Sequence, residues 1–245
     1  MEISIYAINM DRSVDRWNEL SRQAFELGLE LRRIEAVDGA KVSAEDRVDW
    51  NEQAFRLNTG RDLLPGEYGC YRSHMKALAA FLESDTPVGL IVEDDIALVA
   101  DLPARAMAAL DAIPQADVIK FFNHRMVGFR RRATTAYGDR IGRALHGPMG
   151  SAACYLVTRS GATKLLNHMG VMEYPLDIAL ERGWATGTEV FTVHRDVVWS
   201  KRPPSTIATR AVYRTKKFAW WRRLPTHLIR ARDYLSRLRY TFQGH

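Results

Sequence analysis

Cysteine is scarce in this sequence, and long apolar runs are missing from it. Cys70 and Cys154 are the two cysteines among 245 residues, and neither has a partner at a metal-ligand spacing. We therefore expect two buried, reduced thiols, as in a cytoplasmic protein. No apolar stretch approaches the roughly 18–20 residues of a membrane-spanning helix, and the first residues lack the basic and apolar parts of a secretory signal. These absences disfavour a disulfide-stabilised secreted protein and an integral membrane protein.

Acidic residues are nearly missing from the last part of the chain. Residues 210–245 contain ten basic residues and one acid, so they carry +9, which leaves −3 for residues 1–209, given a total of +6. A body this close to neutral argues against a nucleic-acid-binding fold covered in positive charge. We accordingly divide the chain into a domain at 1–209 and a basic tail at 210–245, and we expect no nucleic-acid partner.

The tail has the pattern of a helix that lies in a membrane interface. Its apolar stripe consists of Leu228, Ala231, Leu235, Leu238 and Phe242. The residues around that stripe are Arg230, Arg232, Arg237 and Arg239, with Tyr213, Trp220 and Trp221 before it. We predict that this helix holds the protein peripherally on the anionic inner membrane, where each basic residue adds on the order of 1 kcal/mol. The alternatives are a helix packed on the body with its arginines in water, and a nucleic-acid-binding tail.

Strand and helix patterns alternate along the rest of the chain. Residues 2–8 predict a strand, and a helix capped near Ser13 follows. A second strand at 31–37 completes a strand–helix–strand unit, which is typical of a parallel sheet in an α/β fold. The other predictions are helices from Pro65, at 104–113 and at 160–169 (capped by Ser160), strands at 88–92, 118–122, 152–158 and 190–198, and irregular stretches at 40–63 and 123–150.

An acidic triplet, Glu93-Asp94-Asp95, follows the apolar run at 88–92. Such a continuous apolar run is typical of a central strand that is buried on both faces. Three adjacent carboxylates raise one another's pKa and oppose folding, whereas a bound Mg²⁺ or Mn²⁺ removes that cost. Open α/β sheets bind ligands at the carboxyl ends of strands, so a metal-bridged diphosphate is the simplest chemistry here. An equally simple alternative is that the acids cap the strand and begin a solvated loop.

Five motifs occur in order between about residues 3 and 207. They are Ile8-Asn9-Met10-Asp11-Arg12-Ser13 with Asp15-Arg16 and Asp38-Gly39, Leu64–Cys70 with Ser73-His74, Val92–Asp95, His146-Gly147 to Tyr155 with Ser160-Gly161-Ala162, and Pro175-Leu176-Asp177 with Ser205-Thr206-Ile207. In this order and spacing, the sequence resembles glycosyltransferases of family 25, a group that includes lipooligosaccharide galactosyltransferases of Gram-negative bacteria. It departs from the family pattern at 148–151 and between Gly170 and Pro175, where an acceptor would lie.

The resemblance implies a single Rossmann-like domain of the GT-A type. It also implies metal-dependent transfer of a hexose, commonly galactose, from a UDP-sugar to a lipooligosaccharide or lipopolysaccharide acceptor. Among the motif residues we predict Asp95 as the ligand of Mn²⁺ or Mg²⁺, with Asp94 assisting. Glu93 is then either a ribose contact or a carboxylate that orients the other two.

Donor-binding residues are predicted at the ends of the first two strands and on the helix before the triplet. They are Ile8, Asn9, Arg12, Arg16, Asp38, Gly39, Ser73, His74 and Glu93. Arginines and helix N-terminal amides both favour phosphate. The alternatives are that Arg16 pairs with an acid of its own helix, that Asp38-Gly39 is a plain turn, and that His74 is a core residue.

Inversion at the anomeric carbon, which the resemblance implies, needs a base for the acceptor hydroxyl. Asp177 is the candidate, with Asp94 as a second catalytic carboxylate; alternatively, Asp177 caps a helix. Two other functions fit the same residues. A metal-dependent hydrolase of nucleotide-diphosphate sugars needs the acids but no acceptor, and a non-catalytic adaptor that binds membranes or nucleic acid needs only the tail.

Overall fold

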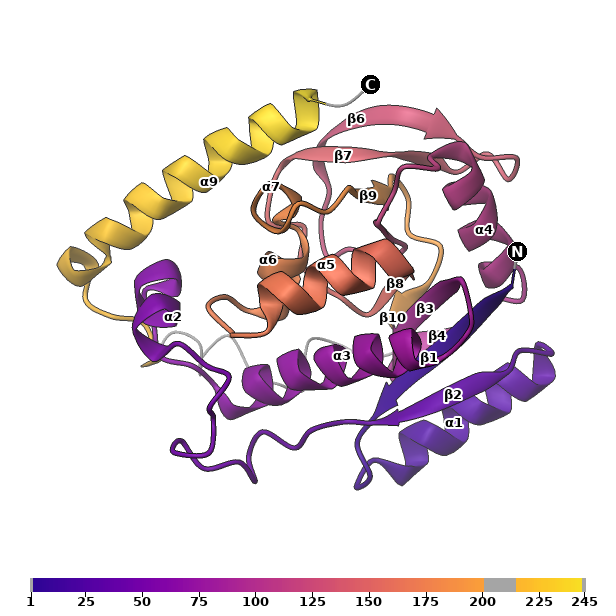
Figure 1. The fold of residues 1–245 in the computed structure, drawn as a ribbon, viewed down its shortest axis with the longest axis horizontal. Helices are drawn as coiled ribbons and strands as arrows, with labels where there is room; N and C mark the ends of the chain where they lie inside the picture. Colours follow the sequence, from indigo (N-terminus) through magenta and orange to yellow (C-terminus); the bar gives the residue numbers. More distant parts are fainter. Residues whose placement is uncertain (1, 201–214, 244–245) are drawn as a thin grey trace.

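A mixed β-sheet lies between two layers of helices (Figure 1). The computed structural model describes residues 2–200 and 215–243. The eight strands of the sheet lie in the order β2-β1-β3-β8-β5-β9-β7-β6, and β4 pairs separately with β10. The strands are β1 (Ile3–Asn9), β2 (Leu31–Glu35), β3 (Val88–Glu93), β4 (Ile96–Ala97), β5 (Val118–Lys120), β6 (Val127–Thr134), β7 (Arg140–His146), β8 (Cys154–Thr158), β9 (Val190–Val193) and β10 (Trp199–Ser200).

Helices cover both faces of the sheet because its strands alternate their side chains between two cores. Ile5 and Ala7 of β1 pack into one core with Leu20, whereas Tyr6 and Ile8 pack into the other. The first core includes α1 and α4, and the second includes α3, α5 and α6. The helices are α1 (Val14–Glu26), α2 (Glu52–Thr59), α3 (Pro65–Glu83), α4 (Leu102–Ala112), α5 (Arg159–Met169), α6 (Leu176–Leu180), α7 (Gly183–Thr186), α9 (Leu224–Phe242) and the 3₁₀ helix η1 (Trp220–Arg223).

The strands β1 and β3 end at the same edge of the sheet. They are parallel neighbours with Ile8 opposite Glu93, so the acidic triplet begins beside the end of β1. β1 is also parallel to β2, which confirms the predicted strand–helix–strand unit. Residues 88–92 are buried on both faces, and this explains the continuous apolar run. Two strand ends are therefore available at one edge to carry a site.

Several predicted boundaries are wrong. Residues 123–150 form the β6–β7 hairpin rather than a loop, and residues 40–63 contain α2. The hairpin has no clear apolar alternation because β6 is an edge strand whose side chains are exposed or half-buried. Helix α5 is capped by Thr158 and not by Ser160, since the Thr158 hydroxyl accepts from the Gly161 N–H at 3.1 Å. The strands predicted at 118–122 and 190–198 end earlier than expected.

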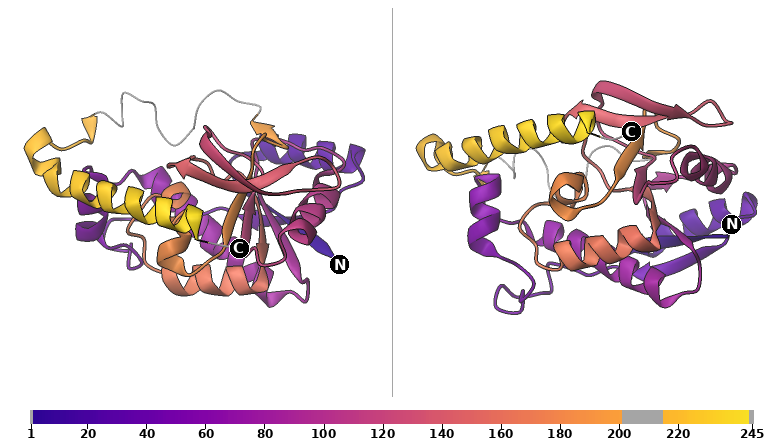
Figure 2. Two further views of the ribbon diagram at one scale, coloured as in Figure 1. Left: turned by 90° about the horizontal axis from the view of Figure 1, so that it is seen from above. Right: turned by 45° about the horizontal axis from the view of Figure 1, so that its top comes forward.

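Helix α9 packs on the body through a largely polar side. It contacts α2, α7 and β7 and runs along the side of the molecule away from α1 (Figure 2). Thr226, Arg237 and Thr241 are buried, whereas Leu228 and Leu235 are 74% and 56% exposed. The helix is thus docked on the body, as one alternative predicted, but Arg237 points inward rather than into water.

Some predictions about the tail and the motifs concern residues outside the described ranges. They are the domain boundary at 209/210, Tyr213 and the motif Ser205-Thr206-Ile207. Across the ranges that the structure does describe, no helix combines the length and the apolar composition needed to cross a membrane.

Candidate active site

A cavity of about 530 Å³ lies at the carboxyl ends of β1 and β3, beside the start of α3. Cavities of this size are typical of small-molecule sites. The predicted residues that line it are Ile8, Arg12, Arg16, Asp38, Gly39, Ser73, His74, Glu93 and Asp94. The lining residues without a predicted role are Met10, Ser13, Ala36, Val37, Ala40, Pro65, Gly66 and Cys70. Most of these lie within the same motifs, so their position in the motifs was the available signal.

Asp94 is held from both sides by protein groups. Its Oδ1 accepts from the guanidinium of Arg16 at 3.0 Å, and its Oδ2 accepts from the amide of Asn9 at 2.7 Å. Asn9 is buried and does not line the cavity, and its own oxygen accepts from Arg33 at 2.7 Å. Arg16 therefore pairs with Asp94 and not with an acid of its own helix. These contacts assign Asn9 to the positioning of Asp94.

Asp95 does not line the cavity, and it has one carboxylate oxygen that the protein leaves unsatisfied. Its Oδ1 is buried and has no hydrogen-bond partner among residues 2–200 and 215–243. Burial first, and then the charges of Glu93 and Asp94, raise the pKa of Asp95 to about 6. An unsatisfied buried acceptor costs roughly 1–3 kcal/mol and is uncommon in folded proteins. A hard divalent cation fits this group, because it binds carboxylate oxygen and offsets the repulsion among the three acids.

Glu93 faces His74 in the wall of the cavity. The Nε2 atom of His74 lies 3.3 Å from Glu93 Oε1, and Nδ1 lies 3.1 Å from the hydroxyl of Tyr155. Together with Cys70, His74 and Glu93 form a group whose potential ligand atoms lie within 4.8 Å of one another. Burial, and then Glu93 and Asp177, raise the pKa of the Cys70 thiol, which keeps it protonated and a poor metal ligand. Asp95 is therefore better suited to a divalent cation than this group is.

The predicted phosphate and ribose contacts differ in how the protein already uses them. Arg12 forms an ion pair with Asp38 at the cavity, and the Arg12 side chain is 60% exposed. The hydroxyl of Ser73 donates to the Gly69 carbonyl at 2.6 Å and accepts from the Val37 N–H at 2.8 Å. Arg12 can therefore turn towards an anion, whereas Ser73 connects α3 to the segment after β2.

Gly39 is needed because two backbone segments meet there. A Cβ atom at Gly39 would lie 1.8 Å from the Pro65 carbonyl oxygen and 2.7 Å from the nitrogen of Gly69. A Cβ atom at Gly69 would lie 2.5 Å from the Val37 carbonyl oxygen. This close approach requires glycine on both segments. It brings the first turn of α3 against residues 37–39 and so closes one side of the cavity.

Asp177 lies in the first turn of α6, but it does not cap that helix. The N-cap is Pro175, and the Asp177 carboxylate accepts from the Ile178 N–H at 2.9 Å. Burial, and then the charge of Glu181, raise the pKa of Asp177. Asp177 does not line the cavity, although its charge acts on the thiol of Cys70, which does. The carboxylate is therefore close to the site and more basic than one in water.

The sequence patterns did not reveal a cluster of buried charged residues near the predicted base, Asp177. Lys120 and Glu181 have fully buried side chains and form an ion pair of 2.9 Å. Glu181 also accepts from Arg237 at 3.0 Å and from the N–H groups of Met149 and Gly150 at 2.9 Å. Burial opposes the ionisation of Glu181, but Lys120 and Arg237 outweigh it and lower its pKa. A lysine inside an apolar strand was the signal that could have revealed this cluster.

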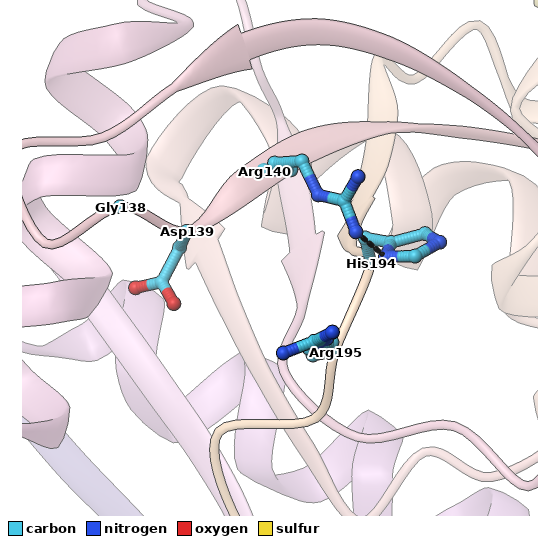
Figure 3. Close-up of a pocket in the computed structure, with 5 residues that line it drawn as sticks. All are labelled: Gly138, Asp139, Arg140, His194 and Arg195. Carbon is cyan, nitrogen blue, oxygen red and sulfur yellow. Dashed lines mark hydrogen bonds between the residues drawn. The ribbon is translucent and has the colours of Figure 1, made fainter.

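A separate hollow of about 360 Å³ lies where β7 begins and β9 ends (Figure 3). Arg140 donates to the ring of His194 at 2.6 Å, and Arg195 lies nearby. Partial burial, and then the charges of the two arginines, lower the pKa of His194. Asp139 is already paired with Arg105 at 2.5 Å. None of the predicted site residues line this hollow, and we assign it no part in the reaction.

The sheet with helices on both faces, and the cavity at the carboxyl ends of β1 and β3, define a mixed α/β protein with a small-molecule-sized site where open α/β sheets bind ligands. A profile of the family described as "Glycosyltransferase family 25 (LPS biosynthesis protein)" matches residues 2–180, which is more than half of the chain. The chain therefore belongs to glycosyltransferase family 25. All the predicted donor-binding, catalytic and metal-binding residues lie within the matched range.

Curated proteins with similar sequences carry names of the same kind. Procollagen galactosyltransferase 2 of Mus musculus is 27% identical over 118 residues, which are 46% of this chain and 19% of that protein. The Homo sapiens protein of the same name is 28% identical over the same share of each chain. A glycosyltransferase 25 family member of Drosophila pseudoobscura pseudoobscura is 30% identical over 132 residues, 50% of this chain and 21% of that protein. The matched region thus spans about a fifth of each relative.

Proposed function

We propose that this chain transfers galactose from UDP-galactose to a saccharide of the lipooligosaccharide or lipopolysaccharide type, with Mn²⁺ or Mg²⁺ bound at Asp95 in a GT-A-type domain. The observation that carries this proposal is the buried, unpartnered oxygen of Asp95 among three acids at the end of β3. The family description names lipopolysaccharide biosynthesis, which supports the acceptor class. Two relatives are named galactosyltransferases, which supports the sugar.

Different residues of the cavity would bind different parts of the donor. A cation held by Asp95, with Asp94 and Glu93 beside it, would neutralise the negative charge of the leaving diphosphate. Arg12 supplies a second positive group in the cavity wall, and its departure from Asp38 leaves that carboxylate able to accept from a ribose hydroxyl. Asn9 and Arg16 keep Asp94 in place.

Asp177 is the proposed base. It takes the proton of the acceptor hydroxyl while that oxygen forms a bond to the anomeric carbon of galactose. The bond between this carbon and the diphosphate oxygen breaks on the opposite side, so UDP leaves and the configuration is inverted. A carboxylate whose pKa is raised by burial accepts a proton more readily than one in water, which suits this role.

Release of UDP tests the proposal. UDP-galactose, UDP-glucose and UDP-N-acetylglucosamine are compared with Mn²⁺ or EDTA, with and without a truncated lipooligosaccharide. We expect release that requires both metal and acceptor and is fastest with UDP-galactose. Asp95→Asn should lower kcat by about 10²-fold or more, whereas Asp85→Asn, an exposed acid before β3, should leave it unchanged. Equal release without acceptor would instead identify a hydrolase, and absence of UDP binding would exclude both enzymes.

We also propose that α9 holds this protein peripherally on the cytoplasmic face of the inner membrane. Its outward stripe includes Leu228, Leu235 and Phe242, all largely exposed, and exposed Trp220 and Trp221 precede it. Apolar side chains on one helix face with tryptophan near the boundary favour an interfacial position. The exposed basic residues along η1 and α9 include Arg222, Arg230, Arg232 and Arg239.

Sedimentation with lipid vesicles tests this attachment. We expect binding to vesicles that contain phosphatidylglycerol and weaker binding to pure phosphatidylcholine, because the basic residues require anionic lipid. The double variant Leu228→Ser/Leu235→Ser should lose binding. Val48→Ser changes an equally exposed apolar residue on the body and should have no effect. Equal binding of the double variant and the wild type would contradict the proposal.

A further inference from the structure

A second cavity, of about 510 Å³, lies between the body and the inner side of α9. Its walls come from the end of α2, from α6 and α7, and from α9. Among the residues that the structure describes, five arginines, three aromatic residues and one carboxylate, that of Asp233, line it. No step of the proposed transfer uses this cavity, and a wall with this excess of positive charge favours an anionic ligand.

Two of the five arginines have no carboxylate partner. Arg182 pairs with Asp233 at 2.9 Å, and the two others that pair are bound to Glu67 and Glu181. Within residues 2–200 and 215–243, Arg125 and Arg230 are bound to no carboxylate. Arg125 donates to the Pro148 carbonyl at 2.7 Å, and Arg230 donates to the Thr59 carbonyl at 3.1 Å. A net positive charge therefore remains at the cavity.

The aromatic part of the wall is suited to a sugar ring. Tyr174, Trp184 and Tyr234 line it as aromatic rings with a polar atom at the edge. The guanidinium of Arg182 lies 4.0 Å from the centroid of the Tyr174 ring, and that of Arg237 lies 5.1 Å from the centroid of the Trp184 ring, so one side of each of these two rings faces an arginine. The ring of Tyr234 is fixed by stacking on His146, at 5.6 Å between centroids, and its hydroxyl lies 3.1 Å from the histidine Nδ1. A saccharide presents apolar C–H faces together with hydroxyl groups, and a phosphate on it would meet the arginines in charge-assisted hydrogen bonds.

This second cavity adjoins the active site. Pro175 and Ile178 of α6 line it, and the proposed base Asp177 lies between them in the sequence. Arg61 lines it as well, and is paired at 2.5 Å with Glu67 in the first turn of α3. That turn also forms part of the first cavity. The ion pair of Arg61 with Glu67 therefore connects the wall of the second cavity to the turn of α3 that lines the first.

We propose that the second cavity binds a phosphate-bearing saccharide, namely a sugar unit of the acceptor next to the one that reacts. Arg125 and Arg230 bind the phosphate, and the aromatic side chains pack on the ring. The assignment to the acceptor rests on the proposed transferase function; the binding of a sugar phosphate does not. The site would make the enzyme prefer phosphorylated acceptors.

Binding of glucose 6-phosphate, measured by calorimetry without any UDP-sugar, tests the site directly. We expect binding to the wild type and about tenfold weaker binding, or more, to Arg230→Gln and to Arg125→Gln, since each loses a charge-assisted bond to phosphate. The matched control Arg239→Gln removes the same charge from the exposed side of α9 and should bind normally. The hydrogen bond of Arg125 to the Pro148 carbonyl is exposed, so we expect Arg125→Gln to fold. That variant therefore still tests the site if Arg230→Gln does not fold.

Separate outcomes distinguish the cavity from the enzyme. Failure of glucose 6-phosphate to bind, or binding to both arginine variants as tight as to the wild type, would overturn the proposal. Equally tight binding of inorganic phosphate would also overturn it, because the ring would then contribute nothing. With active enzyme, Arg125→Gln should raise KM for a phosphorylated acceptor but not for the phosphatase-treated one or for the donor. Arginine-dependent binding in a protein without transferase activity would support the cavity and contradict the proposed function.

Discussion

Replacement of Asp95 by asparagine tests the metal site through stability as well as through activity. Burial and the two neighbouring acids raise the pKa of Asp95 from 3.8 to about 6. At 1.36 kcal/mol for each pKa unit, the ionised carboxylate destabilises the metal-free protein by at most about 3 kcal/mol, and solvent screening of a partly exposed group reduces this to about 1.5 kcal/mol. Removal of the charge is therefore expected to stabilise the protein when no metal is bound.

The pH dependence has a definite sign. Between about pH 4 and pH 6, folded protein keeps a proton on Asp95 that unfolded protein has lost, so this group makes the free energy of unfolding fall as pH rises through that window. In EDTA, Asp95→Asn should raise Tm by about 3–6 °C at pH 7.5 and hardly change it at pH 4. Added Mn²⁺ should raise the Tm of the wild type and leave that of the variant unchanged.

Asp94→Asn is the matched control, and its effect should have the opposite sign. Both oxygens of Asp94 already accept hydrogen bonds, from Arg16 and Asn9, so the asparagine loses an ion pair and sets two amide groups against each other. The expected cost is about 1–3 kcal/mol. Scanning fluorimetry of the three proteins, with EDTA or Mn²⁺, measures these differences. A lower Tm for Asp95→Asn in EDTA at pH 7.5, or equal Mn²⁺ shifts in variant and wild type, would refute the assignment.

Two further substitutions test the framework of the site. Gly39→Ala should cost about 1–3 kcal/mol and weaken UDP binding in a titration, because its Cβ would meet the Pro65 carbonyl; Gly28→Ala, with open space around it, should leave UDP binding intact. Glu181→Gln should cost about 3–5 kcal/mol in chemical denaturation, because Lys120 keeps a buried charge without its carboxylate partner. Glu52→Gln, at an exposed ion pair with Arg56, should cost far less.

Short-range sequence patterns made part of this fold predictable. The unit formed by β1, α1 and β2 follows from alternation and helical spacing, and β3 follows from its continuous apolar run. Because β1 and β3 are parallel neighbours, the acids and the first motif meet at one edge. The β6–β7 hairpin was not predictable in this way, since an exposed edge strand such as residues 127–134, which contains three consecutive arginines, has no apolar period to detect.

The sequence predicted which residues belong to the site better than it predicted what each of them does. Residues from four segments of the chain line one cavity as the motifs indicated, but a motif does not show which hydrogen-bonding atoms already have partners. Asn9 and Ser73 are engaged by the protein, whereas Asp95 keeps an unpartnered oxygen. The ion pair of Lys120 with Glu181 joins residues 61 positions apart, and neither residue belongs to a local pattern. Such roles depend on tertiary contacts and become visible only in the folded chain.

The basic residues of helix α9 have different surroundings, so the net charge of the tail alone does not describe what the helix binds. Arg230 and Arg237 bond to the body, where they line the second cavity, although only Arg237 is buried and Arg230 is exposed. Arg232 and Arg239 are exposed beside the apolar stripe. The inner side of the helix therefore belongs to the body next to α6, and its outer side remains available to lipid. A membrane that binds the outer side would hold the second cavity close to its surface. One helix would then place both the enzyme and a lipid-linked acceptor.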